Sequence, residues 1–258
     1  MELKFLYLFI FIFIITILSI IIIQKFIQVI MDIYNNKKSC VNQKGVILMY
    51  CTQNIIDKWA KYSIDINKQY ALKNGYDFKV IKTPYDSSVT HAWQKIPAMI
   101  QLLEDGYNFV FYIDADAIIN DPSISLESFF DKYEGDLLVC SDEKNSNGLY
   151  AVNGGCVIAK NTKKCKKLLK QWWDLRHEKQ YITFAFEQTA LSDIVRNKIE
   201  NIDSSIISVC PETEFNSIYG EILDYLENKK SDRFVLHFMS LDDNKREKIF
   251  KNYNFSFT

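Results

Sequence analysis

Asp114 and Asp116 are two carboxylates, one residue apart, that directly follow the apolar run Phe109–Ile113. In an extended segment residues i and i+2 project to the same side, so both carboxylates can face one point. Paired anionic oxygens are the ligands with which proteins hold Mg²⁺ or Mn²⁺ beside a polyphosphate. The spacing therefore predicts a divalent-metal site for a phosphate-bearing substrate. A solvated loop is the alternative, because aspartate is also common in turns.

The run that precedes the pair indicates where this site lies in the fold. Its five residues are aromatic or β-branched without polar alternation, which is typical of a strand buried on both faces in a parallel sheet. The two aspartates then lie at the carboxyl end of that strand. Open α/β sheets bind their ligands at this edge.

The rest of the chain after residue 44 predicts strands that alternate with helices. Strands are expected at 45–50, 77–81, 109–113, 136–140, 156–159, 206–209 and 234–238. Helices are expected at 54–74, 93–103, 126–133, 163–173 and 187–195, the first of them ending at Gly75. This alternation predicts βαβ units, and so an α/β fold with a parallel sheet and right-handed crossovers.

An apolar segment precedes the predicted domain. Residues 5–23 are apolar except for Thr16 and Ser19, and a membrane-spanning helix needs ~20 such residues. No small-residue cleavage site precedes Gln24, so we expect a retained signal anchor in the lipid bilayer rather than a removed signal peptide. A buried core helix is the alternative. The predicted organisation is a tail at 1–4, a transmembrane anchor at 5–31, a short stem at 32–44 and one domain at 45–258.

Charge and cysteine content narrow the classes of function. The 258 residues have a net charge of −1, which gives no indication of a nucleic-acid partner. The six cysteines show no C-x-x-C spacing, which argues against a zinc site. They are compatible with disulfides in an oxidising compartment and equally with buried free thiols. The cysteines are Cys40, Cys51, Cys140, Cys156, Cys165 and Cys210.

Five short motifs occur in order along the chain. They are W-x-K at 93–95, YIDADAII at 112–119, NGGCVIAKN at 153–161, EQTAL at 187–191 and LHF at 236–238. In this order and spacing, the chain resembles nucleotide-sugar glycosyltransferases of the GT-A fold over about residues 45–240. In particular it resembles the galactosyl-, mannosyl- and xylosyltransferase group, glycosyltransferase family 34. The resemblance implies a Rossmann-like mixed sheet flanked by helices, here preceded by one transmembrane helix.

The resemblance also implies a metal site. Asp114 and Asp116 would form the DxD pair, with Asp116 on the divalent ion and Asp114 on the metal or the donor ribose. His237 would be the third ligand, and a neutral imidazole suits Mn²⁺ better than Mg²⁺. We therefore expect Mn²⁺, with Mg²⁺ possible. The alternative is a core histidine, since His237 stands between Leu236 and Phe238.

Further roles follow from the other motifs. Glu187 and Gln188 would face the transferred sugar as catalytic residues, and Lys95 would approach the donor diphosphate. Three donor-binding residues would form a small-residue turn beneath the sugar, where the missing Cβ lets substrate approach the backbone. They are Asn153, Gly154 and Gly155. An exposed helix start for Glu187, a tryptophan-anchored helix for Lys95 and an ordinary hairpin turn for the glycines are the alternatives.

The expected activity is transfer of a hexose or pentose from a UDP- or GDP-sugar to a glycan or glycoprotein acceptor, with retention of anomeric configuration. The catalytic domain is expected in the lumen of the Golgi or another secretory compartment. The family usually has a glycine and a lysine soon after the histidine, whereas here Lys245 and Arg246 come later.

Two other functions stay open. One is a phosphatase of the haloacid dehalogenase type, in which Asp114 and Asp116 supply a nucleophile and a general acid and Asp242 with Asp243 forms the late acidic pair. The other is a catalytically inactive, membrane-anchored glycan-binding protein.

Overall fold

The computed structural model describes residues 19–20, 22–27, 44–144, 146–218 and 232–252. It divides the chain into two units, Met1–Gln43 and Lys44–Thr258. Residues 19–20 and 22–27 of the first unit are helical, and no helix within the described ranges is long and apolar enough to cross a membrane. The predicted anchor at 5–31 and stem at 32–44 fall largely outside the described residues, so the anchor stays a prediction.

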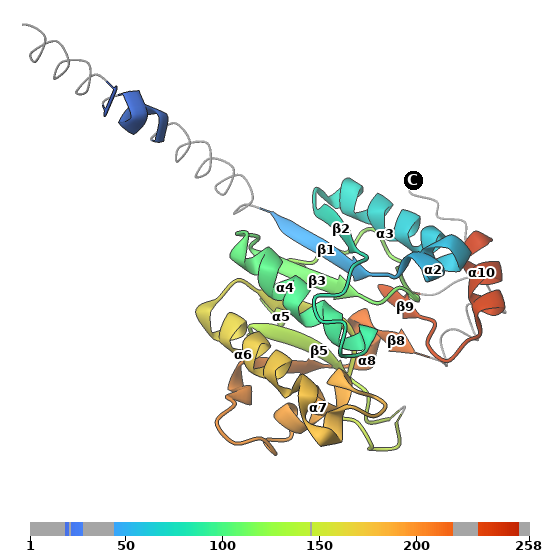
Figure 1. Cartoon of the computed structure of the whole chain (residues 1–258). Coiled ribbons are helices and arrows are strands. Elements are labelled where there is room, and N and C mark those ends of the chain that lie inside the picture. The colour runs from blue at the N-terminus through green and yellow to red at the C-terminus, as the bar shows by residue number, and fades with distance from the viewer. Residues whose placement is uncertain (1–18, 21, 28–43, 145, 219–231, 253–258) are drawn as a thin grey trace, which may run out of the picture. The chain divides into compact units, whose positions relative to one another are not determined.

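The second unit is built on a six-stranded mixed sheet with the order β2-β1-β3-β6-β5-β7 (Figure 1). The first three strands in this order are parallel, whereas β6 is antiparallel to both β3 and β5, and β7 is parallel to β5. The strands are β1 (Gly45–Tyr50), β2 (Asp77–Ile81), β3 (Phe109–Ile113), β5 (Leu137–Ser141), β6 (Val152–Lys160) and β7 (Ile207–Cys210). The mixed α/β sheet implied by the resemblance is confirmed, whereas the parallel sheet predicted from the alternation is wrong at β6, which is antiparallel to both of its neighbours.

Helices cover both faces of this sheet. Alternate side chains of β1 and β3 pack in one apolar cluster with Ile66 and Tyr70 of α3, and α4 contacts the same two strands and packs against α6 (Figure 1). Gly75 ends α3 in the left-handed conformation, with φ 76°, which a residue without a Cβ adopts freely. The helices are α2 (Gln53–Ile55), α3 (Lys61–Asn74), α4 (Lys95–Glu104), α5 (Ser128–Lys132), α6 (Lys163–Asp174), α7 (Glu187–Val195), α8 (Glu212–Phe215) and α10 (Asp243–Lys251).

A second, three-stranded sheet brings the end of the domain to the two aspartates. Its strands are β4 (Ala117–Ile119), β9 (Val235–His237) and β8 (Ser217–Ile218), in the order β4-β9-β8. β9 pairs antiparallel with β4 so that His237 lies opposite Ala117. Because β4 begins one residue after Asp116, this register places the histidine beside the DxD pair.

One expectation needs correction, and one open alternative is confirmed. Residues 153–155 do not form a turn, because they lie inside β6, at the point where its pairing with β5 shifts register from Val139–Val157 to Cys140–Asn153. The N–H groups of Gly154 and Gly155 bond to the side chains of Gln188 and Asn153. The free-thiol alternative is confirmed for the five cysteines within the described residues, all of which are buried and unpaired with one another; Cys40 lies outside them. Burial raises the pKa of the Cys51, Cys165 and Cys210 thiols to about 12.

Candidate active site

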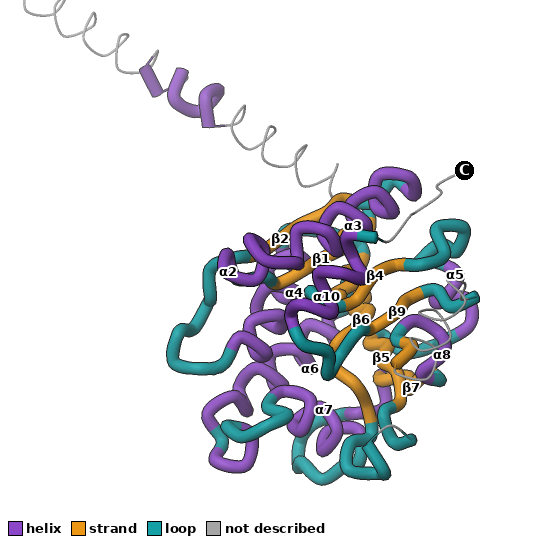
Figure 2. Tube along the Cα trace, turned by 90° about the vertical axis from the view of Figure 1, so that its right-hand side faces the viewer, coloured by secondary structure: helices purple, strands orange, loops and turns teal. Residues whose placement is uncertain are grey.

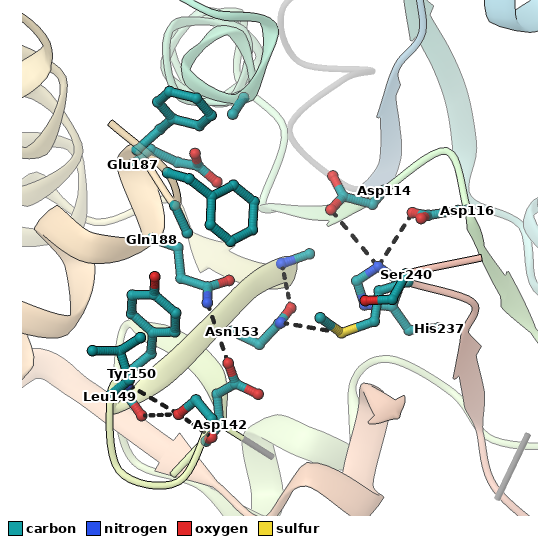
Figure 3. Close-up of a pocket in the computed structure, with 17 residues that line it drawn as sticks. Asp114, Asp116, Asp142, Leu149, Tyr150, Asn153, Glu187, Gln188, His237 and Ser240 are labelled. Carbon is teal, nitrogen blue, oxygen red and sulfur yellow. Dashed lines mark hydrogen bonds and ion pairs between the residues drawn. The ribbon is translucent and has the colours of Figure 1, made fainter. Parts of the chain in front are cut away.

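Asp114, Asp116 and His237 converge at the carboxyl end of β3. One ligand atom from each residue lies within 4.8 Å of the other two, and Figure 3 shows the three side chains turned toward one another. His237 Nε2 lies 3.2 Å from Asp116 Oδ1 and 3.9 Å from Asp114 Oδ2. The predicted constellation is therefore formed, and it presents two hard carboxylates and one imidazole nitrogen to one point.

A chain of amide contacts orients His237. Asn153 Oδ1 accepts the Gly155 N–H at 2.8 Å, so this atom is the oxygen and can also accept the amide of Asn216, whose Nδ2 lies 2.9 Å away. The other end of the Asn216 side chain is then its oxygen, which lies 2.9 Å from His237 Nδ1. Nδ1 must donate in this contact. The lone pair of the neutral ring is consequently on Nε2, which faces the aspartates, as a metal ligand requires.

Gly155 leaves the space in which this cluster assembles. A Cβ at this position would lie 2.3 Å from His237 Cε1 and 2.9 Å from Asp114 Oδ2. At Gly154 a Cβ would meet the tip of the Glu187 carboxylate at 3.1 Å. The glycines were expected to let substrate approach the backbone, but in the structure they first of all make room for the site's own side chains.

Lys95 and Glu187 form a buried ion pair behind the metal-ligand cluster. Lys95 Nζ lies 2.9 Å from Glu187 Oε1, 2.8 Å from the Gly154 carbonyl oxygen and 3.6 Å from Asp114 Oδ1. Burial alone would lower the pKa of Lys95, but the carboxylates of Asp114 and Glu187 raise it above its ordinary value. The ammonium therefore stays charged and forms ion pairs with both Glu187 and Asp114.

Glu187 is not the exposed helix start of the alternative interpretation. It begins α7, is 4% exposed, and its backbone carbonyl accepts the indole N–H of Trp172 at 2.9 Å. Gln188 bonds to one backbone group and one side chain: its Oε1 accepts the Gly154 N–H at 3.0 Å, and its Nε2 donates to Asp142 Oδ2 at 3.2 Å. Both side chains line the cavity described below.

Arg246, on the C-terminal helix α10, reaches the cluster from the other side. Its Nη2 donates to Asp116 Oδ2 at 2.8 Å, and its guanidinium lies 5.2 Å from the ring of Trp59. Burial alone would raise the pKa of Asp116, but His237 and Arg246 lower it to about 2. Trp59 also anchors the start of α10 by donating its indole N–H to Asp243 at 2.9 Å.

A cavity of about 570 Å³ opens in front of these residues, a size that suits a small organic ligand. Asp114, Asp116 and His237 line one part of it. Other lining residues are Asp142, Ser146, Leu149, Tyr150, Phe184, Phe186, Glu187 and Gln188. Lys95 is not among the lining residues, so its predicted contact with the donor stays a prediction.

Three residues at the site had no assigned role in the sequence interpretation. They are Asp142, Asn216 and Arg246, each held by the contacts given above. Arg246 had a detectable signal as a cation after the late histidine, and Asp142 had one as a carboxylate in a predicted loop. Asn216 lies in a short connection before β8 where no pattern marks it.

A mixed sheet of this order, with a carboxylate pair at the end of β3 and a histidine from the last strand, defines a glycosyltransferase of the GT-A fold. The chain belongs to the nucleotide-diphospho-sugar transferase family, whose family model matches residues 52–251. The family implies a nucleotide-sugar donor and a glycan acceptor.

Two solved structures are similar in fold. A glycosyltransferase involved in the glycosylation of the major capsid of PBCV-1 aligns with a TM-score of 0.63 and 20% identity, over 81% of this chain and 98% of that chain. The glycosyltransferase GlyE of Streptococcus pneumoniae TIGR4 aligns with a TM-score of 0.51 and 15% identity, over 81% of this chain and 60% of that chain. No curated protein sequence matches the chain.

Proposed function

We propose that the protein is a metal-dependent glycosyltransferase whose ion is held by Asp114, Asp116 and His237. The observation that supports this most strongly is the orientation of His237, whose Nδ1 bonds to Asn216 so that Nε2 faces the two carboxylates. Oxygen and imidazole ligands together favour Mn²⁺, with Mg²⁺ as the other candidate. A divalent ion bound here supplies neutralisation of the negative charge that develops on the departing nucleotide diphosphate.

The protein's own residues divide the remaining work. Glu187, held by Lys95 and Trp172, would lie beside the anomeric carbon and stabilise positive charge there. Gln188 would hold the backbone of Gly154 in place beneath the transferred sugar. Closure of the cavity around the donor would exclude water. We propose retention of anomeric configuration and transfer of a hexose or pentose from a UDP- or GDP-sugar to a glycan or glycoprotein, as in family 34.

The cellular place is part of the same proposal. The apolar run at 5–23 supports a single N-terminal anchor at 5–31 in a lipid bilayer. A Golgi or other secretory membrane, with the catalytic domain in the lumen, would bring the site to glycoprotein and glycan acceptors.

The phosphatase alternative loses the residues on which it depended. Asp242 caps α10 by accepting the Lys245 N–H at 2.9 Å, and Asp243 accepts the indole N–H of Trp59. Neither carboxylate lines the cavity of the DxD pair. The DxD pair also follows the third strand in chain order, whereas that class has it after the first.

The proposal is tested by a panel of nucleotide sugars incubated with the full-length protein in detergent, with and without Mn²⁺. We expect one donor to release its sugar, and we expect this release to stop when the metal is chelated. Release of phosphate from simple phosphomonoesters, without turnover of any donor, would contradict the proposal.

A further inference from the structure

The cavity has an aromatic end in addition to its metal-ligand end. Leu149, Tyr150, Phe184 and Phe186 line it, and the rings of Phe184 and Phe186 meet edge to face with their centroids 6.2 Å apart. Phe184 is 81% exposed and Leu149 is 65% exposed. A large aromatic side chain that is exposed at the rim of a cavity is typical of binding surfaces, because a bound ligand would bury it.

The two ends of the cavity lie apart. Figure 3 shows Leu149 and Tyr150 on one side and His237 on the other, with Asn153 between them. The anionic diphosphate of a donor needs the cation end of such a cavity. The aromatic end lies apart from that diphosphate position and is free for the second substrate.

Polar groups interrupt the apolar wall. Ser146 Oγ accepts the Tyr150 N–H at 3.0 Å, and the carboxylate of Asp142 lies at the same part of the cavity. Glu187 Oε2 is buried and, among the described residues, has no hydrogen-bond partner, so the carboxylate still has an acceptor position for a hydroxyl group. An acyl chain could donate no hydrogen bond to the buried Glu187 Oε2, whereas a sugar hydroxyl group could.

From this arrangement we infer that the wall formed by Leu149, Tyr150, Phe184 and Phe186 is the acceptor subsite, and that it binds a sugar ring by stacking on Phe184. A pyranose has one face of C–H groups, which packs against the electron-rich face of an aromatic ring, and a rim of hydroxyl groups that donate hydrogen bonds. The carboxylates of Asp142 and Glu187 would accept those bonds. The assignment of this wall to the acceptor rests on the proposed function. The binding of a saccharide there rests on the cavity alone.

The test uses the full-length protein with Mn²⁺, the donor that the panel shows to be turned over, and methyl glycosides of glucose, galactose, mannose and xylose as acceptor probes. Free sugar released by hydrolysis and methyl disaccharide formed by transfer are measured in the same reaction. Phe184→Ala should lower the ratio of transfer to hydrolysis about tenfold, the scale of one lost aromatic contact. Phe184→Trp should restore the ratio, whereas Phe184→Leu, which keeps apolar volume without a ring face, should not.

Ile182→Ala is the matched control, because Ile182 lies on the same loop, is 57% exposed and does not line the cavity. It should keep the wild-type ratio. Full transfer by Phe184→Leu would overturn the inference, because it would show that the acceptor needs apolar volume at this position and no ring face. An unchanged ratio in Phe184→Ala would overturn it as well.

A second measurement separates this inference from the proposed function. Saturation-transfer NMR detects binding of the same methyl glycosides without any donor. A saccharide signal in the wild type that is lost in Phe184→Ala would support the subsite even if no donor were turned over, a result that would refute only the proposed function. No saccharide signal in the wild type, or an equal signal in Phe184→Ala, would overturn the inference.

Discussion

At the scale of single residues, the site depends on contacts that fix orientation. His237 has its nitrogen in the right place only because Asn216 and Asn153 determine which ring atom holds the proton. Glu187 has its place because Lys95 neutralises it inside the protein. A buried charge or tautomer held in this way is sensitive to the loss of one partner.

Asn216→Ala should weaken Mn²⁺ binding by about 10–100-fold while the three ligands stay in place, the usual effect of removing a partner that orients a metal ligand. Electron paramagnetic resonance of free Mn²⁺ measures this directly. An unaltered Mn²⁺ affinity would show that the amide contact does not orient the imidazole.

Glu187→Gln should lower turnover by ~10²-fold or more with little change in donor affinity, the scale of losing a positioned catalytic group. Initial rates and donor binding measure the two quantities separately. NMR of the wild-type product should show the anomeric configuration of the donor, and an inverted product would refute retention. A near-normal rate in the variant would reduce Glu187 to a structural residue.

At the scale of elements, β6 and α10 supply residues that surround the metal ligands. β6 contributes the two glycines over which the side chains assemble. α10, which is charged and has one buried apolar residue, Phe250, packs near Trp59 and against α3 (Figure 2). Each element therefore has a test that leaves the ligands themselves unchanged.

Gly155→Ala should abolish Mn²⁺ binding and lower the free energy of unfolding by roughly 1–3 kcal/mol, because the added Cβ collides with His237 and Asp114. Gly154→Ala is the matched control, since its Cβ meets only the end of a side chain at 3.1 Å. Denaturant unfolding and Mn²⁺ titration of both variants compare them. Equal effects at the two positions would contradict the proposed role of Gly155.

Arg246→Ala should raise the affinity for Mn²⁺ in the absence of donor by about three- to tenfold, because the guanidinium competes with the ion for Asp116. Isothermal titration measures the change.

Tryptophan fluorescence should also change on Mn²⁺ addition in the wild type but not in Trp59→Phe, since Trp59 touches Arg246. Weaker Mn²⁺ binding in Arg246→Ala would mean that the arginine supports the site instead of competing with the ion.

At the scale of the whole molecule, the buried strands could be predicted from the sequence, but the contacts between segments distant in sequence could not. β1 and β3 lie where continuous apolar runs predict buried strands, since their pattern reflects burial directly. β4 and α10 escaped prediction because a three-residue strand and a highly charged helix have no strong periodicity. The DxD pair and His237 could be joined only through family resemblance, because 121 positions separate Asp116 from His237 and the β4–β9 register unites them.

The central claim is that an ion bound by Asp114, Asp116 and His237 drives transfer, and Asp116→Asn tests it most directly. The amide keeps the size of the side chain but removes one anionic ligand. Donor turnover and Mn²⁺ binding are measured on the wild type, on Asp116→Asn and on Asp131→Asn, an exposed aspartate of α5 that serves as the control. The account predicts Mn²⁺-dependent turnover in the wild type and in Asp131→Asn, and neither turnover nor tight Mn²⁺ binding in Asp116→Asn with an unchanged circular dichroism spectrum. Wild-type turnover by Asp116→Asn at saturating Mn²⁺ would contradict it.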